Sequence, residues 1–150
     1  MPRRPASLIT AFIYAVLLAA VLGSILQTQY NLAMLQALGA PLPAAVRLRA
    51  TGLDLLGFAP LFAVLVGLAF VFALPAAAWL GRLLLPLRGL LFALAGALAL
   101  WLAMSLANAL LPMPTLIGAN RSLAGTLGLM ACAGLGAWLF ARLSRPLARP

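Results

Sequence analysis

Side chains that perform acid–base or metal chemistry are almost missing from this 150-residue sequence. It contains one acidic residue, Asp54, and no histidine, and all ten of its basic residues are arginines. A single chain of this kind cannot build a paired-carboxylate site, a Ser-His-Asp triad or a metal site of histidines and carboxylates. We therefore expect a protein that is not an enzyme and binds no metal and no cofactor.

Cysteine is equally scarce, and the positive charge has no nucleic-acid pattern. The single cysteine, Cys132, excludes an intramolecular disulfide. The formal net charge is +9, but the arginines flank apolar segments and do not form a basic surface interleaved with aromatic residues. We expect no nucleic-acid partner, and we expect anionic lipid headgroups to contact the arginines on the cytoplasmic side.

Apolar residues make up 66% of the chain, and the mean hydropathy is +1.17. A helix of about 20 apolar residues crosses a bilayer, and four stretches reach that length. The sequence therefore predicts an all-α, single-domain integral membrane four-helix bundle over residues 1–150. A periplasmic amphipathic helical segment, residues 28–57, connects the first two transmembrane helices. The four transmembrane segments are about 8–27, 58–80, 89–111 and 122–141.

The distribution of arginines predicts the orientation, because cytoplasmic loops are enriched in basic residues. The predicted inner side carries seven arginines and the predicted outer side three. The inner set is Arg3, Arg4, Arg82, Arg88, Arg142, Arg145 and Arg149, and the outer set is Arg47, Arg49 and Arg121. Together with a composition rich in alanine, leucine and arginine, this bias predicts a multi-pass protein of a bacterial inner membrane with both termini in the cytoplasm.

Polar residues gather on the predicted outer side, around the only carboxylate. If residues 44–56 are helical, Arg47, Thr51 and Asp54 fall within about 60° of one another. We expect Asp54 to pair with Arg47 or Arg49, because an unpaired charge beside the membrane is costly. In the alternative, the helix breaks at Gly52 and Asp54 begins the second helix, where the helix dipole favours it.

Three further polar residues, Gln27, Ser105 and Asn108, reach the same side from the first and third segments and complete a candidate polar pocket. For Gln27 and Asn108, capping of a helix end and hydrogen bonding between helices remain equal alternatives. For Asp54, a stapling ion pair and a substrate or proton site both remain open. If the ion pair is a staple, Asp54→Asn should destabilise the protein.

Small residues at a spacing of four mark the fourth segment as a packing surface. Gly128, Cys132 and Gly136 lie on one face of the predicted helix, and glycines weaken a helix unless another helix packs on them. We expect this face to support close packing and self-association, so the partners are a second copy or a larger membrane protein. The expected function is an accessory or assembly role. The alternative is a small transporter, channel or lipid-handling protein. A lipid-interacting regulator is a third class.

Overall fold

The computed structural model of the chain describes residues 7–83, 85–110 and 117–144. Within them are four helices, each long and apolar enough to cross a membrane, which confirms the predicted all-α membrane bundle. Predicted features at Arg3, Arg4, Leu111, Arg145 and Arg149 lie outside the described residues. The helices are α1 (Leu8–Ala37), α2 (Ala44–Leu83), α3 (Arg88–Leu110) and α4 (Leu123–Leu143), with short 3-10 helices η1 (Leu85–Leu87) and η2 (Gly118–Arg121).

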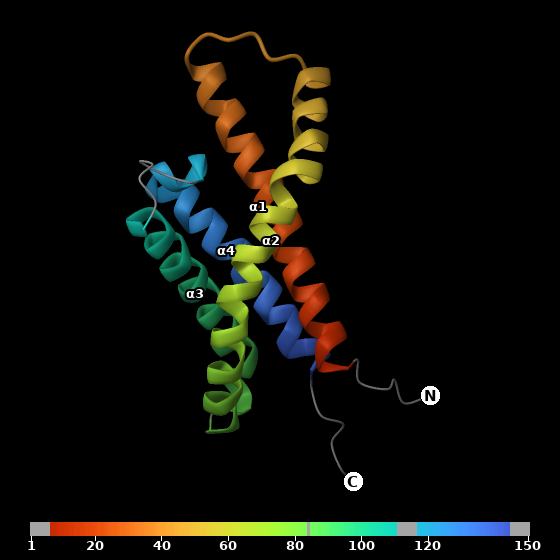
Figure 1. The fold of residues 1–150 in the computed structure, drawn as a ribbon, viewed down its shortest axis with the longest axis vertical. Helices are drawn as coiled ribbons and strands as arrows, with labels where there is room; N and C mark the ends of the chain where they lie inside the picture. The colour runs from red at the N-terminus through yellow and green to blue at the C-terminus, as the bar shows by residue number, and fades with distance from the viewer. Residues whose placement is uncertain (1–6, 84, 111–116, 145–150) are drawn as a thin grey trace.

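The helices form a closed ring in which each packs against the next one in sequence and α1 also packs against α4 (Figure 1). The other two pairs, α1 with α3 and α2 with α4, lie diagonally opposite and share few contacts. The start of α1 and the end of α4 lie at the same end of the bundle, which we call the terminal end. The opposite end, where α1 turns into α2, is the hairpin end.

Two of the helices are much longer than the other two. Lengths of 30 residues for α1 and 40 for α2 correspond to about 45 and 60 Å at 1.5 Å per residue. The 23 residues of α3 and 21 of α4 give about 35 and 32 Å. The end of α1 and the start of α2 therefore extend past the other two helices (Figure 1). We call residues 31–53 the projecting hairpin.

The segment 28–57 is helical except at residues 38–43, and it is not a separate helix. Its first ten residues continue α1, and from Ala44 onward it belongs to α2. The alternative with a break at Gly52 is wrong, because α2 is continuous there and through Pro60 and Pro75. Hydrogen bonds from residues on both sides of Gly52 hold this part of α2 against α1, which offsets the low helix propensity of glycine.

A tight turn joins the two long helices. Gly39 has a φ of +88°, a conformation that glycine adopts without steric cost. The N–H of Gly39 donates to the carbonyl of Gln36, and the N–H of Ala40 donates to that of Leu35, which is the Schellman pattern of helix ends. The carbonyl of Pro43 then accepts from Val46 and Arg47 to begin α2. The turn thus fixes an antiparallel hairpin.

Large side chains fill the interior of the bundle. Helices separated by such side chains enclose a packed core rather than a channel. The interior of the bundle is therefore packed along the described residues. The largest fully buried hydrophobic side chains are Phe62, Phe70, Phe92, Leu100, Met104, Leu129 and Val66.

Glycines allow α4 to approach α1 and α3 closely. A β-carbon on Gly136 would lie 2.5 Å from the carbonyl oxygen of Ala15, and one on Gly128 would lie 2.7 Å from Leu26, both on α1. Cys132, between these glycines in sequence, is buried. Two members of the predicted packing stripe therefore face α1 of the same chain. Self-association remains a prediction, and through these glycines it would require displacement of α1.

Candidate functional site at the hairpin end

Polar side chains join α1 to α2 where the projecting hairpin leaves the bundle. The hydroxyl oxygen of Thr28 lies 2.7 Å from Oδ2 of Asp54. One turn earlier in α2, the amide nitrogen of Gln29 donates to the hydroxyl of Thr51 at 2.9 Å. Nearer the tip, the guanidinium of Arg47 donates to Oε1 of Gln36 at 3.5 Å. We call these pairs, Thr28–Asp54, Gln29–Thr51 and Gln36–Arg47, the polar ladder.

The expected ion pair of Asp54 with Arg47 or Arg49 is not formed among the described residues. Arg47 lies two turns before Asp54, about 10 Å along the helix axis, and its guanidinium reaches Gln36 on the opposite helix. Arg49 is exposed, and it lies about 140° around α2 from Asp54. Thr28 is the nearer polar group, and it takes the place that the sequence assigned to an arginine.

A second set of contacts docks the connection before α4 onto α1. The buried side-chain oxygen of Gln27 accepts from the backbone N–H of Ala119 at 2.8 Å. The hydroxyl of Tyr30 donates to Ser122, whose oxygen also caps α4 by accepting from the N–H of Gly125 at 3.0 Å. Of the two alternatives for Gln27, the structure therefore shows hydrogen bonding between elements rather than capping of a helix end.

Of the two polar residues from α3, Ser105 does not join these contacts. Ser105 is exposed, and its helix lies diagonally across the bundle from α1. Asn108 is half-buried in the last turn of α3. The structure therefore gathers Gln27, Thr51 and Asp54 along α1 and leaves Ser105 apart from them.

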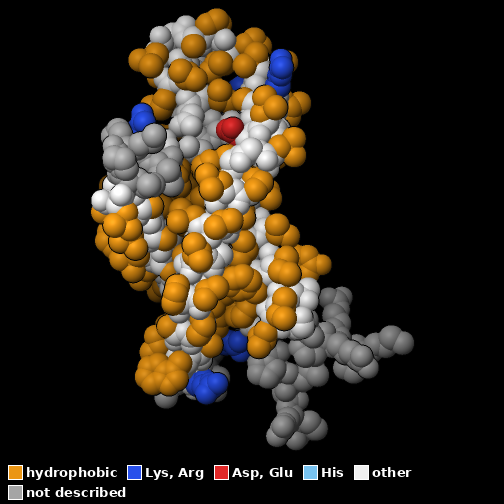
Figure 2. Space-filling model, in the orientation of Figure 1, with side chains coloured by type: hydrophobic (Ala, Val, Ile, Leu, Met, Phe, Trp, Pro, Cys, Tyr) orange, Lys and Arg blue, Asp and Glu red, His pale blue; other side chains and the backbone are white. Residues whose placement is uncertain are grey.

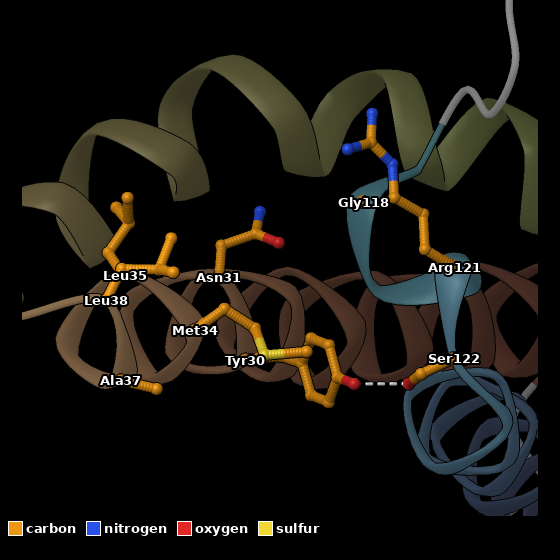
Figure 3. A pocket seen from close by; sticks show the side chains of 9 residues that line it. All are labelled: Tyr30, Asn31, Met34, Leu35, Ala37, Leu38, Gly118, Arg121 and Ser122. Carbon is orange, nitrogen blue, oxygen red and sulfur yellow. Dashed lines mark hydrogen bonds between the residues drawn. The ribbon is translucent and has the colours of Figure 1, made fainter.

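A cavity of about 660 Å³ lies between the outer part of α1 and η2 (Figure 3). This volume is within the range of ligand-binding pockets, about 300–1,000 Å³. Polar groups line the end near the bundle, and apolar side chains line the end toward the tip of the hairpin. Figure 3 shows Asn31 and Arg121 directed toward α2, with the Tyr30–Ser122 bond on the other side. The lining residues are Tyr30, Asn31, Met34, Leu35, Ala37, Leu38, Gly118, Arg121 and Ser122.

Charge at this end of the molecule is mainly positive. Arg47, Arg49 and Arg121 all belong to the hairpin end, and the only carboxylate in the chain faces Thr28. Figure 2 shows basic side chains at both ends of the molecule, with hydrophobic side chains covering the surface between them. In the described ranges, no three histidine, cysteine, aspartate or glutamate side chains lie together as a metal site would require. The site is suited to recognition of an anionic or amphipathic group.

Sequence reasoning missed Thr28 and Ser122 as members of this site. Thr28 is polar, follows Gln27 directly and lies near the end of an apolar stretch. Its residue type and position therefore marked it as a candidate for the polar site. Thr28 and Asp54 are 26 residues apart in the chain and lie on different helices. Their pairing depends on the register between these two helices. Nothing in the local pattern sets that register.

Comparison of the chain with known protein families, curated proteins and solved structures finds no match.

Proposed function

We propose that this chain is a non-catalytic, multi-pass protein of a bacterial inner membrane that acts as an assembly partner, with the projecting hairpin as the surface that it presents to another membrane protein. The sequence assigns seven of the ten arginines to the predicted inner side, and this bias supports an orientation with both termini in the cytoplasm. The hairpin then extends into the periplasm.

The observation that carries this proposal is the length of α1 and α2 beyond the two shorter helices. At about 32–35 Å, α3 and α4 match a hydrocarbon core of about 30 Å. The hairpin rises past them, yet it exposes large apolar side chains: Leu38 is 85% exposed and Leu48 is 77% exposed. Exposed apolar surface outside the bilayer core is typical of an interaction site.

The polar ladder supports the same role, because it holds the two arms of the hairpin together before a partner binds. A preformed surface loses less conformational entropy on binding than a flexible one. The packed interior of the bundle also favours a binding role over conduction through one chain.

A photo-crosslinking residue in place of Leu48 tests the proposal in native membranes. The control is the same residue in place of Leu98, which is 53% exposed on α3 within the predicted bilayer span. We expect discrete protein adducts from position 48 and lipid adducts from position 98. If both positions label lipid alone, the hairpin is not a protein-docking element.

A second candidate function, lipid handling, is favoured by the cavity between α1 and η2. Arg121 and Asn31 supply polar groups at one end, and Met34 and Leu38 supply apolar surface at the other, as an anionic amphiphile requires. Native mass spectrometry with phosphatidylglycerol and phosphatidylcholine tests this function. Arg121→Gln should lose retained phosphatidylglycerol, whereas Arg142→Gln, at the terminal end, should keep it. Equal retention of both lipids by the wild-type chain would exclude the function.

A further inference from the structure

The face of α1 that is buried in the bundle continues, exposed, along the projecting hairpin. Steps of three and four residues keep side chains in one stripe along a helix. Inside the bundle, the stripe consists of the buried residues Ala20, Ser24 and Gln27. The same steps continue it into the projecting hairpin through Asn31, Met34, Leu35 and Leu38, all of them exposed. The spacing of a core stripe is therefore kept where the side chains are no longer buried.

Helix α2 shows the same pattern on its way into the bundle. Its buried stripe includes Ala59 and Phe62, and steps of three and four residues extend it back through Leu55, Gly52 and Leu48. Leu55 is half-buried, whereas Gly52 and Leu48 are exposed. A β-carbon on Gly52 would meet no atom within 4 Å, which leaves room for close approach of another helix. We call the exposed residues of both stripes the open face: Asn31, Met34, Leu35, Leu38, Leu48 and Gly52.

The open face belongs to half of a four-helix arrangement. Inside the bundle, α1 and α2 pack against α4 and α3, which end before the hairpin does (Figure 1). The cavity between α1 and η2 lies on the α1 part of this face (Figure 3). We propose that the open face binds an amphipathic helix of the partner protein, outside the bilayer core, and that this helix carries carboxylates beside its apolar stripe. The proposal rests on the assembly role proposed above.

The spacing on α1 favours a helix as the occupant. Asn31, Met34, Leu35 and Leu38 stand at positions i, i+3, i+4 and i+7, the pattern of contacts that helices make with one another. Gly118 of η2 also lines the cavity, so η2 lies at the base of the face. Because α3 and α4 already match the thickness of the hydrocarbon core, an acyl chain on the open face would have to leave that core. A helix that approaches from outside the bilayer has no such cost.

Arginines around the open face define the charge of its occupant. Arg121 lines the cavity and is directed toward α2 (Figure 3), and Arg47 and Arg49 flank Leu48 in the sequence. Against these three arginines the whole chain has one acidic side chain, Asp54. Carboxylates on the occupant complement this excess of positive charge. A second copy of the chain would bring the same arginines to the face, and like charges repel, so the occupant is a different protein.

Binding of a synthetic helix to the full chain in phosphatidylcholine nanodiscs tests the proposal. The probe is an amphipathic peptide of about 18 residues, long enough to form a helix, with leucines at steps of three and four and glutamates beside them. The control peptide has glutamine in place of each glutamate. After subtraction of binding to empty nanodiscs, we expect the glutamate peptide to bind about tenfold more tightly. Equal binding of the two peptides, or no binding of either, would refute the proposal.

A matched pair of leucine substitutions locates the bound peptide. Leu38→Gln changes the open face, whereas Leu53→Gln changes an exposed leucine that lies about 140° around α2 from Leu48. Both positions are exposed, so both variants should keep the fold. Leu38→Gln should weaken binding of the glutamate peptide about tenfold, and Leu53→Gln should leave it unchanged. Equal effects of the two substitutions would overturn the assignment of the open face.

A photo-crosslinking residue in place of Leu35 tests the open face in native membranes. We expect protein adducts whose crosslinked segment has an aspartate or glutamate within about four residues, one helical turn, of the attachment point. Lipid adducts alone would make a lipid the occupant and refute the proposal. Protein adducts from position 53 but not from position 35 would overturn the open face and leave the assembly role intact. If positions 35 and 48 both label lipid alone, the assembly role fails as well.

Discussion

Replacement of Gly136 by alanine tests whether α4 uses its glycines within one chain. The added β-carbon would lie 2.5 Å from the carbonyl oxygen of Ala15 and 2.9 Å from the β-carbon of Ala19, both on α1. Ordinary contact begins at 3.4 Å, so α1 and α4 must separate locally by about 0.9 Å, the difference between 3.4 and 2.5 Å. A gap of this size forfeits about a quarter to a half of the dispersion energy of the affected contacts.

Overpacking of this kind costs about 1–3 kcal/mol, and the higher helix propensity of alanine returns up to about 1 kcal/mol. We therefore expect Gly136→Ala to destabilise the protein by about 1–2 kcal/mol. The matched control is Gly67→Ala on α2, where a β-carbon meets no atom within 4 Å. This control should be neutral or stabilising by up to about 1 kcal/mol. Reversible unfolding in mixed detergent micelles, followed by circular dichroism, measures both.

The result that would refute this reasoning is a Gly136→Ala chain whose monomer unfolds like the wild type while an oligomer dissociates. That outcome would place the glycine face between copies of the chain, as the sequence alone predicted. Steric trapping of single chains in bilayers distinguishes the two cases, because it reports unfolding of the monomer without a contribution from association.

Three further predictions follow from the hairpin end. Gln27→Leu leaves the buried N–H of Ala119 without its acceptor and should cost about 1–3 kcal/mol, whereas Gln36→Leu, at an exposed and long contact, should change the unfolding free energy by less than about 0.5 kcal/mol. Gly39→Ala places a side chain in the left-handed backbone conformation and should lower the unfolding free energy by about 1–2 kcal/mol in the same assay. An unchanged unfolding free energy would mean that the turn can rearrange. Asp54→Asn should retain stability, because the amide oxygen can accept from the hydroxyl of Thr28 as the carboxylate does. Melting temperatures of the two chains decide between this expectation and the destabilisation expected of an ionic staple.

Helix number was predictable because length and apolarity alone identify a membrane-spanning segment. The helix ends at the terminal side also agree within a few residues, since arginine and proline follow the apolar runs there. The prediction placed the end of the first helix and the start of the second incorrectly, because residues 28–57 mix polar and apolar side chains. That mixture is as compatible with a surface helix as with the continuation of two helices that support each other.

Interhelical partners were less predictable than the helices. Gly67 and Gly136 both belong to small-residue stripes in the sequence, yet only Gly136 has backbone atoms within reach of a β-carbon. The difference lies in the rotation of each helix about its own axis, which long-range packing determines. The same applies to Asp54, because its partner was chosen by charge from its own helix, whereas the structure supplies a hydroxyl from the facing helix.

One turn of α1 connects the two halves of the hairpin end. Gln27 and Tyr30 bond to the connection that precedes α4, while Thr28 and Gln29, between them in sequence, bond to α2. Four consecutive residues of a helix point in directions that cover most of its circumference, so this turn contacts both neighbouring elements at once. A change in the Thr28–Asp54 hydrogen bond would therefore act on the segment of α1 that also positions η2 and borders the cavity. The single carboxylate lies where a small change in hydrogen bonding can reach the exposed hairpin on one side and the cavity on the other.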